Sequence, residues 1–134
     1  MTDPIRLLLA DDQQMVRAGF RLVLDAQPDM SVVGEANDGA EALQLVDELA
    51  PDVVLMDIRM PVLDGLGATE KIMKSHPEAK ILVLTTFDLD EYVHSALRAG
   101  ASGFMLKDAG PTELLAAIRA VRDGDSVVAP SATR

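Results

Sequence analysis

The sequence contains no cysteine among its 134 residues. Disulfide bonds and thiolate metal sites are therefore excluded, and a cytoplasmic location is the simplest expectation, because structural disulfides belong to oxidising compartments. No apolar run approaches the roughly 20 residues that span a bilayer. The N-terminal residues also lack the basic start and small-residue cleavage site of a signal peptide. We therefore expect no membrane association.

Positive charge is scarce as well. Twelve lysine and arginine residues stand against 22 aspartate and glutamate residues, which gives a formal net charge of −10. Duplex DNA is bound through basic side chains that neutralise phosphates, so this chain is not expected to bind nucleic acid by itself. Hydrophobic residues make up 49% of the chain, which is enough for a packed core and argues against disorder. The length fits one domain.

Short apolar runs alternate with segments in which apolar residues recur at helical spacing. The runs are Ile5 to Ala10, Ser31 to Glu35, Val53 to Met56, Ile81 to Leu84 and Ser102 to Leu106. Strands that are apolar throughout are buried on both faces, which requires helices on both sides of a parallel sheet. With right-handed crossovers, the pattern predicts an open doubly wound α/β fold.

The residues at the predicted helix ends agree with this alternation. Asp38 with Glu41, and Asp88 with Glu91, have the spacing of an N-cap and a carboxylate three residues later. Pro111 suits the first turn of the last helix, because proline needs no backbone N–H partner there. The sequence therefore predicts five β-α units in succession.

Polar side chains stand where four of the predicted strands end. Asp11 and Asp12 follow the first strand, Asp57 the third, Thr85 the fourth and Lys107 the fifth. In a doubly wound sheet, ligands bind at this edge. Three neighbouring carboxylates repel one another unless a cation lies among them, and Mg²⁺ prefers oxygen ligands. An aspartate can form an acyl phosphate, and a lysine can pair with its phosphoryl oxygens.

Four fragments of the chain resemble a response-regulator receiver domain. They are Leu9-Ala10-Asp11-Asp12, Met56-Asp57-Ile58-Arg59-Met60-Pro61 with Asp64-Gly65, Leu84-Thr85-Thr86, and Gly100-Ala101-Ser102-Gly103-Phe104-Met105-Leu106-Lys107. Each fragment is weak alone, but together their order and spacing match the family over nearly the whole chain. The resemblance implies the CheY-like, flavodoxin-like fold, with five parallel strands in the order 2-1-3-4-5 and five helices.

The resemblance also implies roles for single residues. Asp57 is similar to the phosphoacceptor, and Lys107 to the lysine that contacts a phosphoryl oxygen. Thr85 resembles the hydroxyl that turns toward the phosphoryl group, and Phe104 resembles the aromatic residue that swings inward with it. Because Phe104 has no hydroxyl, burial alone would set the balance between its inward and outward positions.

A Mg²⁺ site is implied in the same way. Asp12 resembles the direct ligand, and Asp11 the acid that reaches the metal through water. Asp57 is expected to be a further ligand. Arg59, two residues after it, is expected to offer its backbone carbonyl.

The residue after Lys107 departs from the commonest family pattern, since Asp108 stands where many receivers have proline. The Lys-Asp ending, like Thr85-Thr86-Phe87-Asp88, resembles the LuxR-type (NarL/FixJ) regulators, which carry a C-terminal helix-turn-helix. We expect residues 1–125 to form the receiver. Residues 126–134 include the small and polar stretch Ala129-Pro130-Ser131-Ala132-Thr133-Arg134 and are expected to begin a linker to a DNA-binding domain beyond this sequence.

The predicted function is a signalling switch and not an enzyme, although a receiver takes part in its own Mg²⁺-dependent phosphorylation and dephosphorylation. A sensor histidine kinase would phosphorylate Asp57. The receiver would then dimerise and control DNA binding by the attached domain. The alternative is a stand-alone receiver that acts by protein–protein interaction.

The sequence disfavours three other functional classes. A phosphatase of the haloacid-dehalogenase type needs a second acid two residues after Asp57, where Arg59 stands. A flavodoxin-type cofactor binder needs a Ser/Thr/Gly-rich loop after the first strand, where Asp11-Asp12-Gln13-Gln14 would repel phosphate. A degenerate receiver used only for protein contact would fail to bind Mg²⁺.

Overall fold

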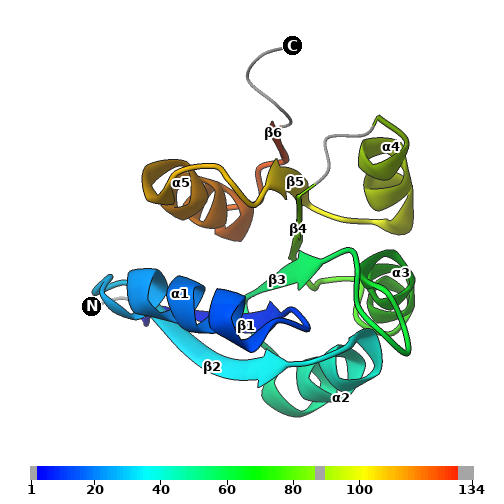
Figure 1. Cartoon of the computed structure of the whole chain (residues 1–134), viewed down its shortest axis with the longest axis horizontal. Coiled ribbons are helices and arrows are strands. Elements are labelled where there is room, and N and C mark those ends of the chain that lie inside the picture. Colours follow the sequence, from blue (N-terminus) through cyan, green and yellow to red (C-terminus); the bar gives the residue numbers. More distant parts are fainter. Residues whose placement is uncertain (1–2, 87–89, 130–134) are drawn as a thin grey trace.

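Six parallel strands form one sheet in the order β2-β1-β3-β4-β5-β6 in the computed structural model, which describes residues 3–86 and 90–129 (Figure 1). The strands are β1 (Ile5–Ala10), β2 (Met30–Ala36), β3 (Val53–Asp57), β4 (Ile81–Thr85), β5 (Gly103–Leu106) and β6 (Val127–Ala129). The first five occur in the predicted order 2-1-3-4-5, and the doubly wound α/β fold is confirmed.

Helices cover both faces of the sheet, as the apolar strands require. One face carries α1 (Gln14–Asp25) and α5 (Pro111–Arg122), and the other carries α2 (Gly39–Leu49), α3 (Gly65–Ser75) and α4 (Asp90–Ala99) (Figure 1). The chain therefore forms three layers, with the sheet in the middle.

The core follows from the two-residue period of the strands. In β1, Leu7 and Leu9 pack into the apolar cluster that includes Ile118 of α5. Leu8 points to the opposite face and joins the cluster that includes Ile72 of α3. Successive side chains of a strand point to opposite faces, so a strand covered on both sides is apolar at nearly every position. Burial of each of these leucine or isoleucine side chains stabilises the folded state by about 1.5–3 kcal/mol relative to leaving it exposed.

Local signals fix the helix starts. The Asp38 side chain accepts a hydrogen bond of 2.8 Å from the Glu41 N–H, which confirms the predicted cap of α2. Pro111 stands in the first turn of α5 after the N-cap Gly110, also as predicted. The predicted cap of α4 involves Asp88, which lies outside the described residues.

The sixth strand differs from the sequence prediction. A linker is predicted from residue 126, but Val127–Ala129 pair in parallel with β5, Val127 opposite Gly103 and Ala129 opposite Met105. The pairing satisfies backbone groups of a strand that would otherwise form the edge of the sheet. Three residues are too few to give a periodic signal, which explains why composition alone indicated a linker. The division at residue 125 stays a prediction.

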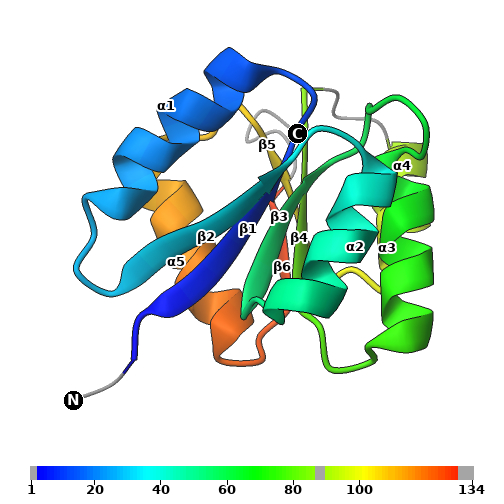
Figure 2. The same ribbon diagram turned by 90° about the horizontal axis from the view of Figure 1, so that it is seen from below.

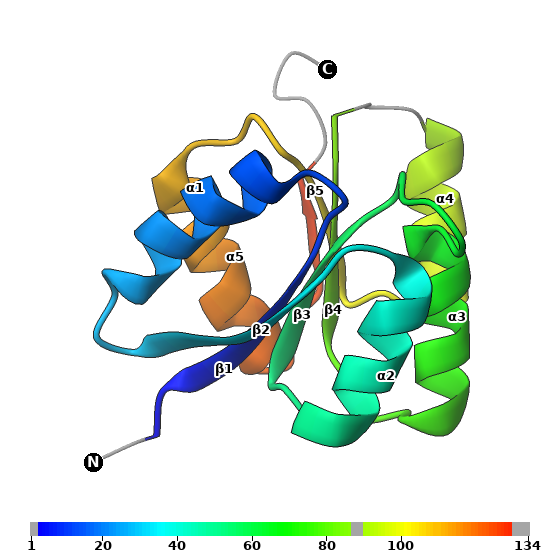
Figure 3. The same ribbon diagram turned by 60° about the horizontal axis from the view of Figure 1, so that its bottom comes forward.

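All the strands run in the same direction, so their carboxyl ends lie at one edge of the sheet. Figures 2 and 3 show the loops that leave β1 and β3 at this common edge. This edge holds the residues that the sequence singled out. Among the described helices, none is long and apolar enough to cross a membrane.

Candidate functional site

The carboxyl ends of three strands bring Asp11, Asp57 and Lys107 together. Asp11 follows β1, and its N–H donates a hydrogen bond of 3.0 Å to the carbonyl of Ala36 in β2. Asp57 is the last residue of β3. Lys107 follows β5, and its N–H donates a bond of 2.8 Å to the carbonyl of Thr85 in β4. Sheet hydrogen bonds therefore set the positions of side chains that are far apart in the sequence.

The loop after β3 returns closely over Asp57. The N–H of Gly65 donates a hydrogen bond of 2.8 Å to the carbonyl of Ile58. A Cβ atom at Gly65 would lie 1.9 Å from the backbone oxygen of Asp57, so only glycine fits. Asp64 then caps α3 by accepting a bond of 2.8 Å from the Gly67 N–H. The Asp64-Gly65 pair thus anchors the start of α3 against the end of β3.

Lys107 places one ammonium group between two carboxylates. Its Nζ lies 2.6 Å from Oδ2 of Asp11 and 3.2 Å from Oδ2 of Asp57. The three side chains are almost completely buried. Asp11 is held further by its Oδ1, which accepts a bond of 2.9 Å from the Gln13 N–H.

Burial and charge oppose one another at Asp57. Burial raises the pKa of Asp57, the positive charge of Lys107 lowers it, and the negative charge of Asp11 raises it again, so that the pKa lies above its ordinary value. Burial acts to lower the pKa of Lys107, but its hydrogen bond to Asp11 and the charge of Asp57 outweigh this effect and raise it. The lysine therefore stays charged, while the negative charge of Asp57 is only partly compensated.

The three predicted acids form one cluster. Carboxylate oxygens of Asp11, Asp12 and Asp57 all lie within 4.8 Å of one another, and Asp12 is exposed to solvent. Hard oxygen donors of this kind suit a hard divalent cation that keeps some of its water ligands. The Lys107 ammonium contacts two of these three carboxylates, Asp11 and Asp57, so the donor set and its net negative charge both fit such a cation.

Three further predicted residues differ in their burial and position. Thr85, the last residue of β4, is 1% exposed. Phe104 in β5 is completely buried in the apolar core cluster on the α2-α3-α4 side of the sheet. Arg59 is exposed in the loop after β3. The structure therefore brings Asp11, Asp12, Asp57 and Lys107 into one group, while Phe104 lies in the core.

A groove of about 540 Å³ opens beside the cluster. It is lined by Asp12 and Arg59 and extends to Tyr92 of α4. A second hollow, of about 570 Å³, lies at the opposite edge of the sheet and is lined by residues such as Asp52 and Lys80. Ligands of open α/β sheets bind at the carboxyl ends of the strands, so the groove beside Asp12 is the candidate site.

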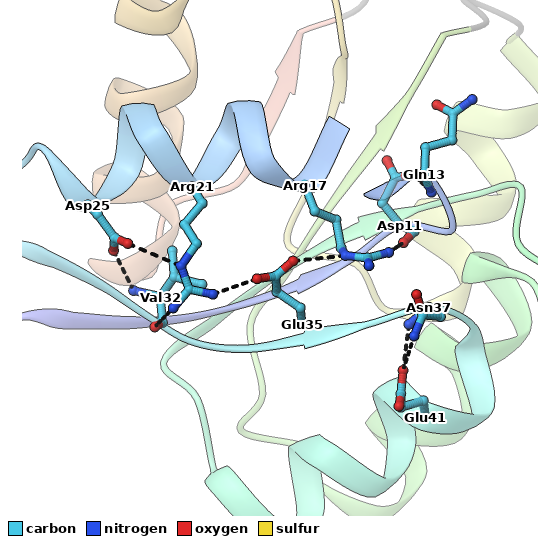
Figure 4. A network of polar contacts seen from close by, with 9 residues as sticks. All are labelled: Asp11, Gln13, Arg17, Arg21, Asp25, Val32, Glu35, Asn37 and Glu41. Atoms are coloured by element: carbon cyan, nitrogen blue, oxygen red, sulfur yellow. Dashed lines mark hydrogen bonds and ion pairs between the residues drawn. The ribbon is translucent and has the colours of Figure 1, made fainter. Parts of the chain in front are cut away.

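Arg17, which lies on α1 and contacts Asp11, was not among the site residues predicted from the sequence. Its side chain is 9% exposed, and its guanidinium contacts the backbone carbonyl of Asp11 and the carboxylate of Glu35 (Figure 4). The sequence spacing could have indicated its burial, because Arg17 stands seven residues before the buried Leu24, on the same face of the helix. A charge on a core-facing stripe needs a buried partner.

A family comparison accounts for this arrangement. The model of the response regulator receiver domain matches residues 7–119, which include the acid cluster and Lys107. The chain belongs to the response regulator receiver domain family. The receiver resemblance drawn from the four sequence fragments is confirmed.

Relatives of this receiver are named as regulators. It is 51% identical over 125 residues to the uncharacterized transcriptional regulatory protein YxjL of Bacillus subtilis (strain 168), covering 93% of this chain and 57% of that protein. It is 50% identical over 125 residues to the oxygen regulatory protein NreC of Staphylococcus aureus (strain JH9), covering 92% of this chain and 58% of that protein. The receiver thus spans less than two thirds of these relatives.

Solved structures agree with the fold and the subfamily. A LuxR-family two-component response regulator from Aurantimonas sp. SI85-9A1 is 37% identical with a TM-score of 0.89, over 93% of this chain and 89% of that one. The receiver domain of the response regulator NarL from Mycobacterium tuberculosis is 35% identical with a TM-score of 0.88, over 92% of this chain and 99% of that one. The resemblance to receivers of LuxR-type regulators is confirmed.

Proposed function

We propose that this receiver accepts a phosphoryl group on Asp57 from the phosphohistidine of a sensor histidine kinase, in a reaction that requires Mg²⁺. The observation that carries the proposal is the grouping of three carboxylates within 4.8 Å, with the Lys107 ammonium 3.2 Å from Asp57. Family membership favours this function over a dehalogenase-type phosphatase or a flavodoxin-type binder.

The proposed transfer is a simple exchange of bonds. A carboxylate oxygen of Asp57 attacks phosphorus, and a new P–O bond forms as the P–N bond to the imidazole breaks. The imidazole nitrogen keeps the electron pair, and the product on the receiver is an acyl phosphate. Water later hydrolyses this bond and returns Asp57 to a carboxylate. Because the transition state demands little covalent help, the protein mainly positions groups and balances charge.

Asp57 is suited to this step by its surroundings. It is the last residue of a strand that is buried on both faces, and Gly65 restrains the loop over it. The Lys107 ammonium is close enough to pair with a phosphoryl oxygen after transfer. Asp11 and Asp12 would hold Mg²⁺ together with Asp57 and the backbone carbonyl of Arg59. When bound, the ion neutralises charge on the phosphoryl oxygens.

The output of the switch is proposed to pass through Thr85 and Phe104. Thr85 ends the strand next to Asp57, so a hydroxyl movement toward a phosphoryl group would disturb β4 and its neighbour β5. Phe104 is inward in this structure, packed against the α2-α3-α4 side. Its position would couple the phosphoryl group to the face formed by α4, β5 and α5. That face, or the one formed by α1 and α5, would control dimerisation.

A DNA-binding domain is proposed to follow the receiver in the full-length protein. The chain spans 57% and 58% of two relatives, of which one is named a transcriptional regulatory protein and the other a regulatory protein. The net charge of −10 leaves DNA recognition to another part of the molecule. We also propose a cytoplasmic location, where such a regulator can reach DNA.

Intact-mass spectrometry tests the function. The purified chain is incubated with acetyl phosphate and Mg²⁺, and we expect the mass of one added phosphate. The label should be lost in hydroxylamine, which cleaves acyl phosphates, and should be absent with EDTA. Asp57→Asn is expected to take no label, whereas the exposed acid variant Asp47→Asn should label like the wild type.

Two outcomes would contradict the proposal. A wild-type chain that stays unlabelled in Mg²⁺ would support a degenerate receiver that acts by protein contact alone. Labelling that persists in Asp57→Asn at the wild-type rate would place the phosphoacceptor elsewhere.

A further inference from the structure

Arg17 on α1 joins the end of β1 to β2 through a buried guanidinium (Figure 4). Its Nη1 donates a hydrogen bond to the backbone carbonyl oxygen of Asp11. Its Nε lies 2.9 Å from Oε1 of Glu35 in β2. The two contacts use different nitrogens of one planar group, a geometry that arginine provides and lysine does not.

The carbonyl that Arg17 contacts belongs to the peptide group that links Asp11 to Asp12. Fixing the plane of this peptide fixes the directions in which both side chains leave the backbone. Other groups restrain Asp11 but not this carbonyl: its N–H bonds to Ala36, and its carboxylate accepts bonds from Gln13 and Lys107. Arg17 therefore supplies a restraint that the rest of the site lacks among the described contacts.

Glu35 balances the charge of Arg17. Its other oxygen, Oε2, lies 2.5 Å from Nη1 of Arg21. The Nε of Arg21 lies 3.3 Å from Oδ2 of Asp25, one helical turn further on (Figure 4). Burial acts to raise the pKa of Glu35, but the hydrogen bonds from Arg17 and Arg21 outweigh it and hold that pKa below its ordinary value. Glu35 is thus a charged partner that keeps Arg17 on the β2 side, where it does not compete with a cation for the acid cluster.

We propose that Arg17, held by Glu35, is a positioning residue for the cation site, because it fixes the Asp11–Asp12 peptide so that both carboxylates stay beside Asp57. This inference deepens the proposed function and rests on it for the need of Mg²⁺. Residues that orient metal ligands from outside the ligand set commonly change metal affinity by tenfold to a hundredfold, roughly, when they are replaced.

The direction in which Mg²⁺ affinity changes when Arg17 is replaced distinguishes a positioning role from a purely electrostatic one. Arg17 carries a positive charge close to the acids, so its removal should strengthen cation binding if charge alone mattered. Positioning predicts the opposite, because a loosened Asp11–Asp12 peptide presents the carboxylates less well. A weaker affinity after loss of a positive charge is an outcome that simple Coulomb repulsion does not produce.

The test compares Arg17→Met with Arg21→Met by titrating Mg²⁺ into the whole chain and following amide NMR shifts. Methionine keeps the aliphatic part of the side chain and removes the charge. Arg21→Met is the matched control. It removes the same charge from a residue that also contacts Glu35 but does not contact Asp11 in the described structure. We expect Arg17→Met to bind Mg²⁺ about tenfold more weakly than the wild type. Arg21→Met should stay within about twofold of it, as screened surface charges contribute little.

Arg17→Lys keeps the measurement decisive if Arg17→Met does not fold. Lysine retains the charge, so electrostatics predicts an unchanged affinity. Positioning predicts a weaker one, since a single ammonium does not match the two directions that Arg17 serves. An affinity for Mg²⁺ at or above the wild-type value in the folded variants would overturn the inference.

The two proposals fail in distinguishable ways. Mg²⁺ binding is measured without a phosphodonor, so a wild type that binds Mg²⁺ but takes no phosphoryl group would contradict the proposed function while leaving the Arg17 comparison intact. A labelled wild type with equal Mg²⁺ affinity in Arg17→Met would contradict only the positioning role. A wild type that binds no Mg²⁺ would overturn both.

Discussion

The Nζ atom of Lys107 lies 3.2 Å from Oδ2 of Asp57, and both side chains are nearly buried. The same ammonium lies 2.6 Å from Asp11, so one positive charge serves two carboxylates. Charge in this pocket is therefore unbalanced, and replacements that change it should alter both stability and the response to Mg²⁺.

Lys107→Ala is expected to lower the free energy of unfolding in EDTA by about 1–3 kcal/mol, because two buried carboxylates lose their hydrogen-bonded counter-charge. Mg²⁺ should then stabilise the variant more than it stabilises the wild type, since the ammonium no longer competes for the same oxygens. Urea unfolding with EDTA and with Mg²⁺ measures both effects. Lys74→Ala is the control, because that lysine is exposed on α3. Equal stability of Lys107→Ala and the wild type in EDTA would contradict this account of the pocket.

Asp57→Asn is expected to stabilise the Mg²⁺-free protein at neutral pH by about 0.5–2 kcal/mol, the usual range for a favourable single change. The pKa of Asp57 is raised by burial in the folded state, so the folded protein holds this proton more tightly than the unfolded chain does. Stability therefore falls as pH rises from the ordinary value of 3.8 through the raised pKa, and it stays reduced above it. Asparagine avoids this loss.

The pH dependence provides the check. The gain in unfolding free energy of Asp57→Asn over the wild type should be absent below the ordinary pKa of aspartate. It should grow as the pH rises from that value through the raised pKa of Asp57. Asp47→Asn, at an exposed carboxylate, should show no such growth. Thermal unfolding in EDTA across this pH range measures the difference, and an advantage that is constant with pH would refute the role of Asp57 ionisation.

Gly65→Ala is expected to destabilise the protein by at least about 2 kcal/mol, because the new Cβ would lie 1.9 Å from the backbone oxygen of Asp57 and the loop must move. Gly19→Ala on α1 is the matched comparison, since nothing lies within 4 Å of its Cβ position. It should stabilise the helix by about 0.5–1 kcal/mol. Opposite shifts in the thermal midpoint are expected. Similar shifts in both variants would mean that Gly65 is not closely packed.

Phe104→Tyr is expected to cost about 1–3 kcal/mol if the ring stays inward, because its hydroxyl would enter a completely buried apolar cluster. Movement of the ring outward would relieve this cost. Combining it with Tyr92→Phe makes the new tyrosine the only one in the chain, so acrylamide quenching of its fluorescence reports its exposure. Full stability together with a quencher-protected ring would show that the cluster accepts a hydroxyl.

The order of elements could be predicted because apolar spacing records burial locally. A strand covered on both faces needs apolar residues at nearly every position. β3 and β4 are apolar up to their polar last residues, and β1 is apolar apart from Arg6. The parallel sheet then implied that Asp11, Asp57 and Lys107 meet at one edge. Composition also assigned the tail to a linker, but β6 owes its existence to pairing with β5, which no local pattern encodes.

The sequence by itself determined the alternation of strands and helices and the acids and lysine at the strand ends, because these depend on neighbouring residues and on the direction of the strands. Only the tertiary structure decided how those groups share contacts. Lys107 and Asp11 are 96 residues apart and meet at 2.6 Å through the register of the sheet. Arg17 could be located at the Asp11 carbonyl only once α1 was packed against β2, since a buried arginine finds its partners through the fold.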